Sequence, residues 1–307
     1  MKTINNFIKI IIFLVVLNGG ILLITYVLTP KIPSFYREKH YDAVFFGTSQ
    51  SYCSFDPLIF DEYDLKTYNR GRQQQTMNYT YYYIKDALDV CDIDVVVLEV
   101  FGMFYEEDDT GFISEGVRDS SLNDMRTKIE AIRECVPEEM QISYFFPLDK
   151  YHFRWEELDY ASWNGFYNSA LKPYYEEADR GYKRWTESEV CVDDYWSIAF
   201  SEIRRDVYAG NIKYLDKIYE LCQKKGAKLI LVTAPLPCYD RVIEETNTVS
   251  DWAEEHDIEL INYMRLQDVL ELNFYTDSLD GGTHLNESGA GKVSKHLAAY
   301  LKENYFE

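Results

Sequence analysis

The sequence is short of positive charge and lacks the usual nucleotide-binding loops. Its 307 residues include 31 Lys and Arg against 52 Asp and Glu, which gives a net charge of −21. Nucleic-acid binding needs clustered basic side chains that neutralise phosphates, so this acidity argues against that class of partner. Neither G-x-G-x-x-G nor G-x-x-x-x-G-K-[ST] occurs, and a nucleotide- or flavin-binding role is therefore set aside.

The six cysteines form no C-x-x-C pair and have no zinc-finger spacing, so we expect no metal site. Outside the cell an even number of cysteines permits disulfides, but six cysteines allow 15 pairings and the sequence does not choose among them. Buried free thiols are the favoured interpretation for most of the six. They are Cys53, Cys91, Cys135, Cys191, Cys222 and Cys238.

Residues 10–28 form a long apolar run without a charged residue. Nineteen residues at about 1.5 Å each extend about 28 Å, close to the hydrocarbon thickness of a bilayer. A cleaved signal peptide is the competing interpretation, but no A-x-A-like site precedes Pro30. We predict an uncleaved single-pass membrane anchor, with residues 1–9 as a cytoplasmic tail and residues 29–40 as a linker.

The basic residues that flank this run do not fix its orientation. Lys2 and Lys9 precede it, while Lys31, Arg37 and Lys39 follow it, so the positive-inside count is nearly a tie. An extracellular position for the rest of the chain is a hypothesis that depends mainly on the resemblance described below.

The remainder alternates short apolar strands with helical patterns. Strands are predicted at residues 41–46, 94–100, 228–234 and 258–263, with a weaker candidate at 65–69. One helix covers residues 212–222 and ends at Gly226, and a closing helix covers residues 290–301 with Asn286 as its N-cap. This alternation predicts an α/β domain over residues 41–307, with a mostly parallel sheet covered on both faces.

Residues 105–205 break the alternation. They are rich in Tyr, Trp and acidic residues and contain four of the five tryptophans, Trp155, Trp163, Trp185 and Trp196. We predict a helical insertion packed over one edge of the sheet. Within it, His152 and Trp155 belong to a basic and aromatic cluster that could line a glycan-binding cleft, although core or interface packing is the favoured alternative.

Two segments carry residues suited to nucleophilic catalysis. Ser49 follows the first predicted strand directly, and ligands of open parallel sheets bind at the carboxyl ends of the strands. Asp280 and His284 lie four residues apart in a Gly-rich loop before the closing helix. A neutral His accepts a serine proton when a carboxylate holds its other nitrogen in the donor form.

The order of these segments resembles that of the SGNH/GDSL hydrolases, in particular the membrane-anchored bacterial branch associated with cell-surface O-acylation. Phe46-Gly47-Thr48-Ser49 stands in place of the G-D-S block, and the segment from Asp280 to Asn286 stands in place of the D-x-x-H block. The resemblance covers about two thirds of the chain and implies a flavodoxin-like, doubly wound sheet.

The resemblance also implies Ser49 as nucleophile, His284 as general base and Asp280 as the acid that orients it. The Asp–His spacing is one residue longer than usual, so Asp277 is the alternative acid. In the family, backbone N–H groups of the nucleophile and of a Gly in the second block form the oxyanion hole, which implies Ser49 and Gly71. The family's Asn after the third strand is missing, because Glu99-Val100-Phe101-Gly102 stands there, and we expect Gln75 to supply the replacement donor.

We therefore expect a membrane-tethered serine esterase or O-acyltransferase that acts on acyl esters, acetyl above all, of a cell-envelope glycan, with no metal or organic cofactor. Partners would be that glycan or its acyl donor, and a membrane-bound acyltransferase is a further candidate. Without Lys2 and Lys9 the net charge is −23, which favours a neutral glycan over an anionic one. The alternative is a catalytically silent SGNH-like domain that binds or positions a polymer or a membrane acyltransferase.

Overall fold

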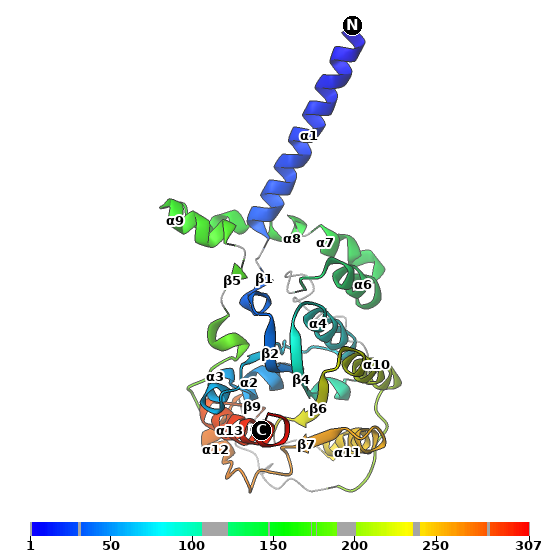
Figure 1. Cartoon of the computed structure of the whole chain (residues 1–307), viewed down its shortest axis with the longest axis vertical. Coiled ribbons are helices and arrows are strands. Elements are labelled where there is room, and N and C mark those ends of the chain that lie inside the picture. Colours follow the sequence, from blue (N-terminus) through cyan, green and yellow to red (C-terminus); the bar gives the residue numbers. More distant parts are fainter. Residues whose placement is uncertain are drawn as a thin grey trace.

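A parallel five-stranded sheet lies at the centre of the chain, with helices on both of its faces and a long N-terminal helix projecting from one end (Figure 1). The computed structural model describes residues 2–29, 32–105, 122–146, 148–172, 174–175, 177–188, 201–235, 240–280 and 283–306.

The sheet confirms the predicted strands and their parallel direction. Its members are β2 (His40–Phe46), β3 (Thr67–Asn69), β4 (Asp92–Glu99), β6 (Lys228–Thr233) and β7 (Glu259–Asn262). Their order in space is β3-β2-β4-β6-β7, and every neighbouring pair is parallel. Numbered along the chain this is the order 2-1-3-4-5, which defines a flavodoxin-like doubly wound sheet with its switch point between β2 and β4.

Alternation along the strands divides the core into two layers. Val96 and Leu98 of β4 face a layer that includes α4 (Met77–Val90), α10 (Ala209–Lys225) and α11 (Asp240–Glu255). Val95 and Val97 face the opposite layer, built from α3 (Pro57–Phe60) and α13 (Glu287–Tyr305). Successive side chains of a strand point to opposite faces, so these strands need apolar residues at nearly every position.

Both predicted helix ends are confirmed. Gly226 ends α10 in the left-handed conformation with φ of 79°, which glycine adopts without steric cost. The Asn286 side chain begins α13 by accepting hydrogen bonds from the backbone N–H groups of Ser288 (3.0 Å) and Gly289 (3.2 Å). This cap fixes the point at which the loop carrying His284 enters the helix.

The insertion does not form one unit over a sheet edge, as the sequence interpretation expected. Helices α6 (Met125–Cys135) and α7 (Gln141–Phe145) come first, and α6 packs against α4. Further on, α8 (Leu148–Tyr151) and α9 (Trp163–Phe166) flank the end of the N-terminal helix (Figure 1). Residues 178–181 then contact the edge strand β3, and residues 183–188 run along α2 and the start of α13. Trp196 lies outside the described residues.

The N-terminal helix α1 (Lys2–Leu28) begins before the predicted apolar run and ends with it. Its segment Asn6–Leu28 has a mean hydropathy of 2.7, and the side chains of residues 6–24 are all exposed, so by length and composition it fits a membrane span or a signal sequence. Strand β2 begins near this end of the molecule and runs away from α1 (Figure 1). All five strands therefore direct their carboxyl ends away from α1.

Four cysteines, Cys53, Cys91, Cys135 and Cys222, are buried free thiols, which confirms the sequence interpretation for these four. Burial raises the pKa of Cys53 and Cys222 to about 12, so both stay protonated and unreactive. Cys191 and Cys238 lie outside the described residues.

A fully buried arginine, Arg70, directly follows β3 and packs against the segment that leads into β2. The Arg70 guanidinium lies between the rings of Phe35, Tyr36 and Tyr83, at 4.6 to 5.2 Å from their centroids. Its Nη2 donates to the Tyr36 hydroxyl at 2.9 Å, and that hydroxyl donates to the buried carboxylate of Asp86. Removal of one partner from such a chain leaves the others buried without compensation.

We therefore predict that Arg70→Met lowers the free energy of unfolding by about 3 kcal/mol or more. Arg204→Met is the matched control, because Arg204 pairs with Asp251 on the surface and exposed pairs contribute little. Urea unfolding of the detergent-solubilised chain would measure both variants. Equal stability of the two would contradict the role assigned to Arg70.

Candidate active site

Ser49 is the first residue of a short helix that begins where β2 ends. Gly47 turns the chain with φ of 132°, a region that other residues rarely adopt. Thr48 then caps α2 (Ser49–Ser54), because its Oγ1 accepts a hydrogen bond from the Gln50 N–H at 3.2 Å. Ser49 itself is half-buried and lies at the carboxyl end of the central strands.

His284 lies in a small hairpin that precedes α13. Strands β8 (Ser278–Leu279) and β9 (His284–Leu285) pair antiparallel, with Leu279 opposite His284. Asp280, at the turn, has φ of 46°, which Asp tolerates better than most residues. Its Oδ1 accepts hydrogen bonds from Thr283 Oγ1 (2.6 Å) and the His284 N–H (3.1 Å), so the carboxylate is held in place.

The structure brings Ser49, His284 and Asp280 into one hydrogen-bonded chain, although Ser49 and His284 are 235 positions apart. His284 Nε2 is 2.8 Å from Ser49 Oγ, and His284 Nδ1 is 2.8 Å from Asp280 Oδ2. A carboxylate only accepts hydrogen bonds, so Nδ1 carries the proton and Nε2 is left to accept from the serine hydroxyl. This arrangement can transfer a proton from Ser49 to His284.

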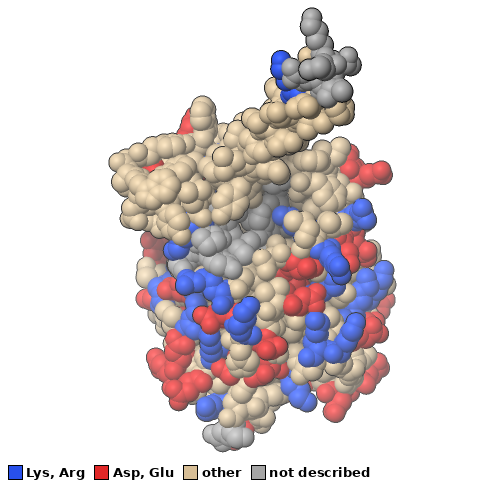
Figure 2. Space-filling view, turned by 45° about the horizontal axis from the view of Figure 1, so that its top comes forward, with Lys and Arg blue, Asp and Glu red and all other residues tan. Residues whose placement is uncertain are grey.

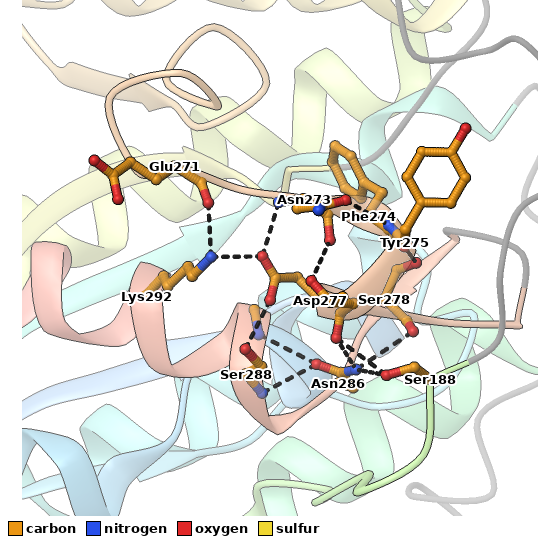
Figure 3. A network of polar contacts seen from close by, with 12 residues as sticks. Ser188, Glu271, Asn273, Phe274, Tyr275, Asp277, Ser278, Asn286, Ser288 and Lys292 are labelled. Carbon is orange, nitrogen blue, oxygen red and sulfur yellow. Dashed lines mark hydrogen bonds and ion pairs between the residues drawn. The ribbon is translucent and has the colours of Figure 1, made fainter.

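Asp277, the alternative acid, belongs to a different network (Figure 3). Its carboxylate is buried and accepts hydrogen bonds from Ser288 Oγ (2.7 Å), Lys292 Nζ (2.7 Å) and the Asn273 N–H (2.8 Å). Burial opposes its ionisation, but these donors together lower its pKa. The structure thus ties Asp277 to α13 and places Asp280 beside His284.

Asn286 joins this network to the segment that precedes the hairpin (Figure 3). Its Nδ2 donates to the Thr276 carbonyl at 2.7 Å and to Ser188 Oγ at 2.9 Å, while its Oδ1 caps α13. One buried amide thus fixes both ends of the loop that carries Asp280 and His284.

Of the three predicted oxyanion donors, one is free to bind a ligand and two already donate hydrogen bonds to other side chains. Among the described residues, nothing accepts a hydrogen bond from the Ser49 N–H. The Gly71 N–H, however, donates to Asn69 Oδ1 at 2.9 Å, and Gln75 Nε2 donates to Thr80 Oγ1 at 3.0 Å. The predictions for Gly71 and Gln75 are corrected accordingly: Asn69 accepts from the Gly71 N–H, and the Gln75 amide is fully buried and donates to Thr80.

Glu99 is buried directly behind the nucleophile. Its Oε2 accepts hydrogen bonds from the Thr48 N–H (3.1 Å) and Thr48 Oγ1 (2.9 Å), and its Oε1 accepts one from the Phe101 N–H (2.7 Å). A Cβ on Gly47 would come within 2.9 Å of the Glu99 side chain, which explains the glycine there. Glu99 therefore positions the turn that presents Ser49.

Two further polar side chains brace this site, and the sequence analysis missed them. Gln50 Nε2 donates to the Thr283 carbonyl at 2.7 Å and so links α2 to the histidine loop. Asn69 Nδ2 donates to the Ser51 carbonyl at 2.9 Å and links α2 to β3. Both side chains are buried, but no local pattern marks a buried amide in the sequence.

Tyr52, Lys183 and Trp185 form a group of aromatic and basic side chains at α2. The Tyr52 side chain interacts with that of Ser49, and burial raises its pKa to about 12, so its hydroxyl stays neutral. Lys183 Nζ lies 4.5 Å from the Trp185 ring centroid and 5.9 Å from that of Tyr52. The Lys183 N–H donates to the Tyr52 carbonyl at 2.8 Å, which attaches this segment of the insertion to α2.

His152 and Trp155 lie elsewhere. Tyr151 packs with Leu28 at the end of α1, and Arg154 Nη1 donates to the Leu28 carbonyl at 2.6 Å. In Figure 1 this region and the site at α2 and β9 are at opposite ends of the domain. The insertion therefore carries His152 and Trp155 to the end of α1, away from Ser49, and the alternative that they line the substrate cleft is corrected.

No protein-family model matches the chain. No curated protein matches its sequence significantly. A solved structure from Bacteroides fragilis NCTC 9343, described as a candidate acylhydrolase, matches with 12% identity and a TM-score of 0.39, over 91% of this chain and 92% of its own. A GDSL-like lipase from Bacteroides thetaiotaomicron VPI-5482 matches with 11% identity and a TM-score of 0.39, over 87% and 89%. Both TM-scores lie below 0.5, so the inferences below rest on this chain alone.

The two candidate acids can be separated by matched substitutions. We predict that Asp280→Asn lowers the rate at which Ser49 reacts with a fluorophosphonate by on the order of 10³-fold or more, because His284 loses the carboxylate that fixes its tautomer. Asp277→Asn should leave that rate nearly unchanged and lower the free energy of unfolding by about 1–3 kcal/mol. The opposite pattern would assign the orienting role to Asp277.

Glu99 gives a pH prediction. Burial raises its pKa from the ordinary 4.5 to about 7, although hydrogen bonds from Phe101 and Thr48 oppose the rise. Between these values the folded protein keeps a proton that the unfolded chain releases, so the free energy of unfolding falls as pH rises, by up to about 3 kcal/mol above pH 7. Glu99→Gln removes this loss, and urea unfolding at pH 5 and pH 8 would show a smaller pH dependence. An unchanged pH dependence would contradict the assignment.

Proposed function

We propose that the protein is a serine esterase or O-acyltransferase that acts on acyl esters of a cell-envelope glycan. The observation that carries the proposal is the chain Ser49–His284–Asp280, with both contacts at 2.8 Å, at the carboxyl edge of the sheet. This edge, at the switch point between β2 and β4, is where doubly wound sheets bind their ligands. The order of the three residues along the chain is that of the SGNH/GDSL hydrolases, which the sequence resembles.

In the proposed reaction Ser49 Oγ attacks the ester carbonyl carbon and His284 Nε2 takes the serine proton. The Ser49 N–H stabilises the charge that develops on the carbonyl oxygen. When the ester bond breaks, His284 returns the proton to the departing alcohol and the acyl group stays on Ser49. Water or a sugar hydroxyl, deprotonated by His284, then attacks the acyl carbon. His284 returns that proton to Ser49 Oγ as the bond between Ser49 and the acyl group breaks. The chemistry needs no metal or organic cofactor.

The surroundings of Ser49 support a carbohydrate ester. Tyr52 and Trp185 offer aromatic surfaces beside the nucleophile, and aromatic rings pack well against sugar faces. The net charge of −21 repels a strongly anionic polymer, which favours a neutral glycan. Acetyl is the proposed acyl group, and the glycan or its acyl donor is the proposed partner.

We further propose that α1 anchors the protein in the cell membrane, with the α/β domain outside the cell. The 23 residues of Asn6–Leu28, most of them apolar, extend at about 1.5 Å each beyond the thickness of the hydrocarbon layer. Because β2 runs away from α1, the site opens away from the bilayer and would meet an ester that extends from the membrane (Figure 1).

One observation favours a second function, that of a catalytically silent domain that binds or positions a polymer or a membrane acyltransferase. Of the three predicted oxyanion donors, only the Ser49 N–H is available. Loss of one donor costs about 10²- to 10³-fold in turnover in serine hydrolases, so a site with a single donor would be a weak catalyst.

A fluorophosphonate probe separates the two functions. We predict that the detergent-solubilised full chain is labelled, that Ser49→Ala abolishes labelling and that His284→Ala slows it by on the order of 10³-fold or more. Ser143→Ala, which changes a serine in α7, should label normally. An active protein should also release nitrophenol from nitrophenyl acetate. No labelling of the native chain would favour the binding function and overturn the enzyme proposal.

A further inference from the structure

The elements around the end of α1 are packed onto it. Leu28 is buried in a cluster with Tyr151, Leu158 and Ala170. Arg154 Nη1 donates to the Leu28 carbonyl at 2.6 Å, and the Tyr26 hydroxyl donates to the Leu171 carbonyl at 3.2 Å. The segment from α8 to residue 171 therefore has a fixed position relative to the last turn of α1.

The same region exposes most of the large apolar side chains that are accessible outside α1. Of fifteen such side chains among the described residues, nine lie within residues 140–167, where Trp163 is 74% exposed and Phe146 is 68% exposed. Single exposed apolar residues are ordinary, but a local concentration of this kind marks an interaction surface. We call its six most exposed members the aromatic face. They are Ile142, Phe146, Phe153, Trp155, Tyr160 and Trp163.

This face surrounds the base of α1. In Figure 1, α9 extends sideways from the end of α1, while α8 and α7 lie on the other side of it. Figure 2 shows the surface around the base of α1 as largely free of charge, with most acidic and basic side chains further down the domain. Residues 140–148 and 160–171 contain no charged residue, in a chain with 27% charged residues.

The composition and position of the face indicate its partner. Trp and Tyr concentrate at membrane–water interfaces, where an apolar ring meets lipid and a polar group meets water. Val27 and Leu28 of α1 pack in a cluster with Tyr151, Leu158 and Ala170. Four members of the face lie in the same segment as these partners, so the face is adjacent to the end of α1. A soluble partner would have to bind beside a helix that is itself covered by lipid.

We propose that the aromatic face rests in the interfacial layer of the bilayer that α1 crosses. The inference depends on the proposed membrane anchor and is independent of the proposed chemistry. The domain would then have two attachments to the membrane, the span and this face, and would not swing freely on a linker. The sheet would stand with its carboxyl edge away from the lipid.

Bromine atoms on lipid chains quench tryptophan fluorescence at contact, which tests the inference in the full chain. The chain would be reconstituted in vesicles of phosphatidylcholine with plain or brominated acyl chains. We expect brominated lipid to quench the native protein, and the double variant Trp155→Phe, Trp163→Phe to lose about half of that quenching or more, because these two are the most exposed of the described tryptophans. Trp185→Phe, beside Ser49, is the matched control and should keep it.

Three results would overturn the inference. Native protein that is equally fluorescent in both lipids has no tryptophan at the bilayer, and a double variant quenched as strongly as the native chain places the contact elsewhere. Extraction of the chain by alkaline carbonate would show that α1 is not inserted, and the inference would fall with the anchor. Fluorophosphonate labelling of Ser49 in the same vesicles reports the proposed chemistry separately and shows that each variant is folded.

Discussion

The parallel pairing of β2 with β4 determines where the reactive groups of this chain lie. The register sets Phe46 opposite Leu98, so the residues that follow each strand emerge at the same edge. The chain turns to opposite sides after these two strands, which leaves a space between their connections. Ser49 begins α2 at that space, Glu99 lies behind it, and the hairpin before α13 brings His284 across it.

Much of this arrangement could be predicted from local sequence. The strands are continuous apolar runs because both faces of the sheet are covered, and such runs are recognisable without a structure. Gly226 and Asn286 mark helix ends by their own conformational and hydrogen-bonding properties. Ser49 directly follows a predicted strand and His284 precedes a predicted helix, so both could be recognised as candidates from the sequence. The contact between them, in contrast, needed the fold.

The details that failed depend on partners distant in sequence. Gly71 and Gln75 have suitable donors, but Asn69 and Thr80 decide where those donors point. Glu99 looks like a solvated strand end until the turn at Gly47 folds over it. His152 and Trp155 form the expected aromatic cluster, yet the path of the insertion carries them to α1. In each case the chemical type of the residue could be interpreted from the sequence, but the direction in which its side chain points could not.

In the proposed membrane-anchored arrangement, the direction of β2 sets how far Ser49 stands from the bilayer. Seven residues at about 3.3 Å each place the carboxyl edge roughly 20 Å beyond the start of the strand, which lies on the side of α1. Sugars still close to a lipid carrier would lie beneath the serine, whereas units displaced outward by continued synthesis would pass it. A tethered domain of this shape would act as a ruler, modifying a polymer only after it has grown past a set distance from the membrane.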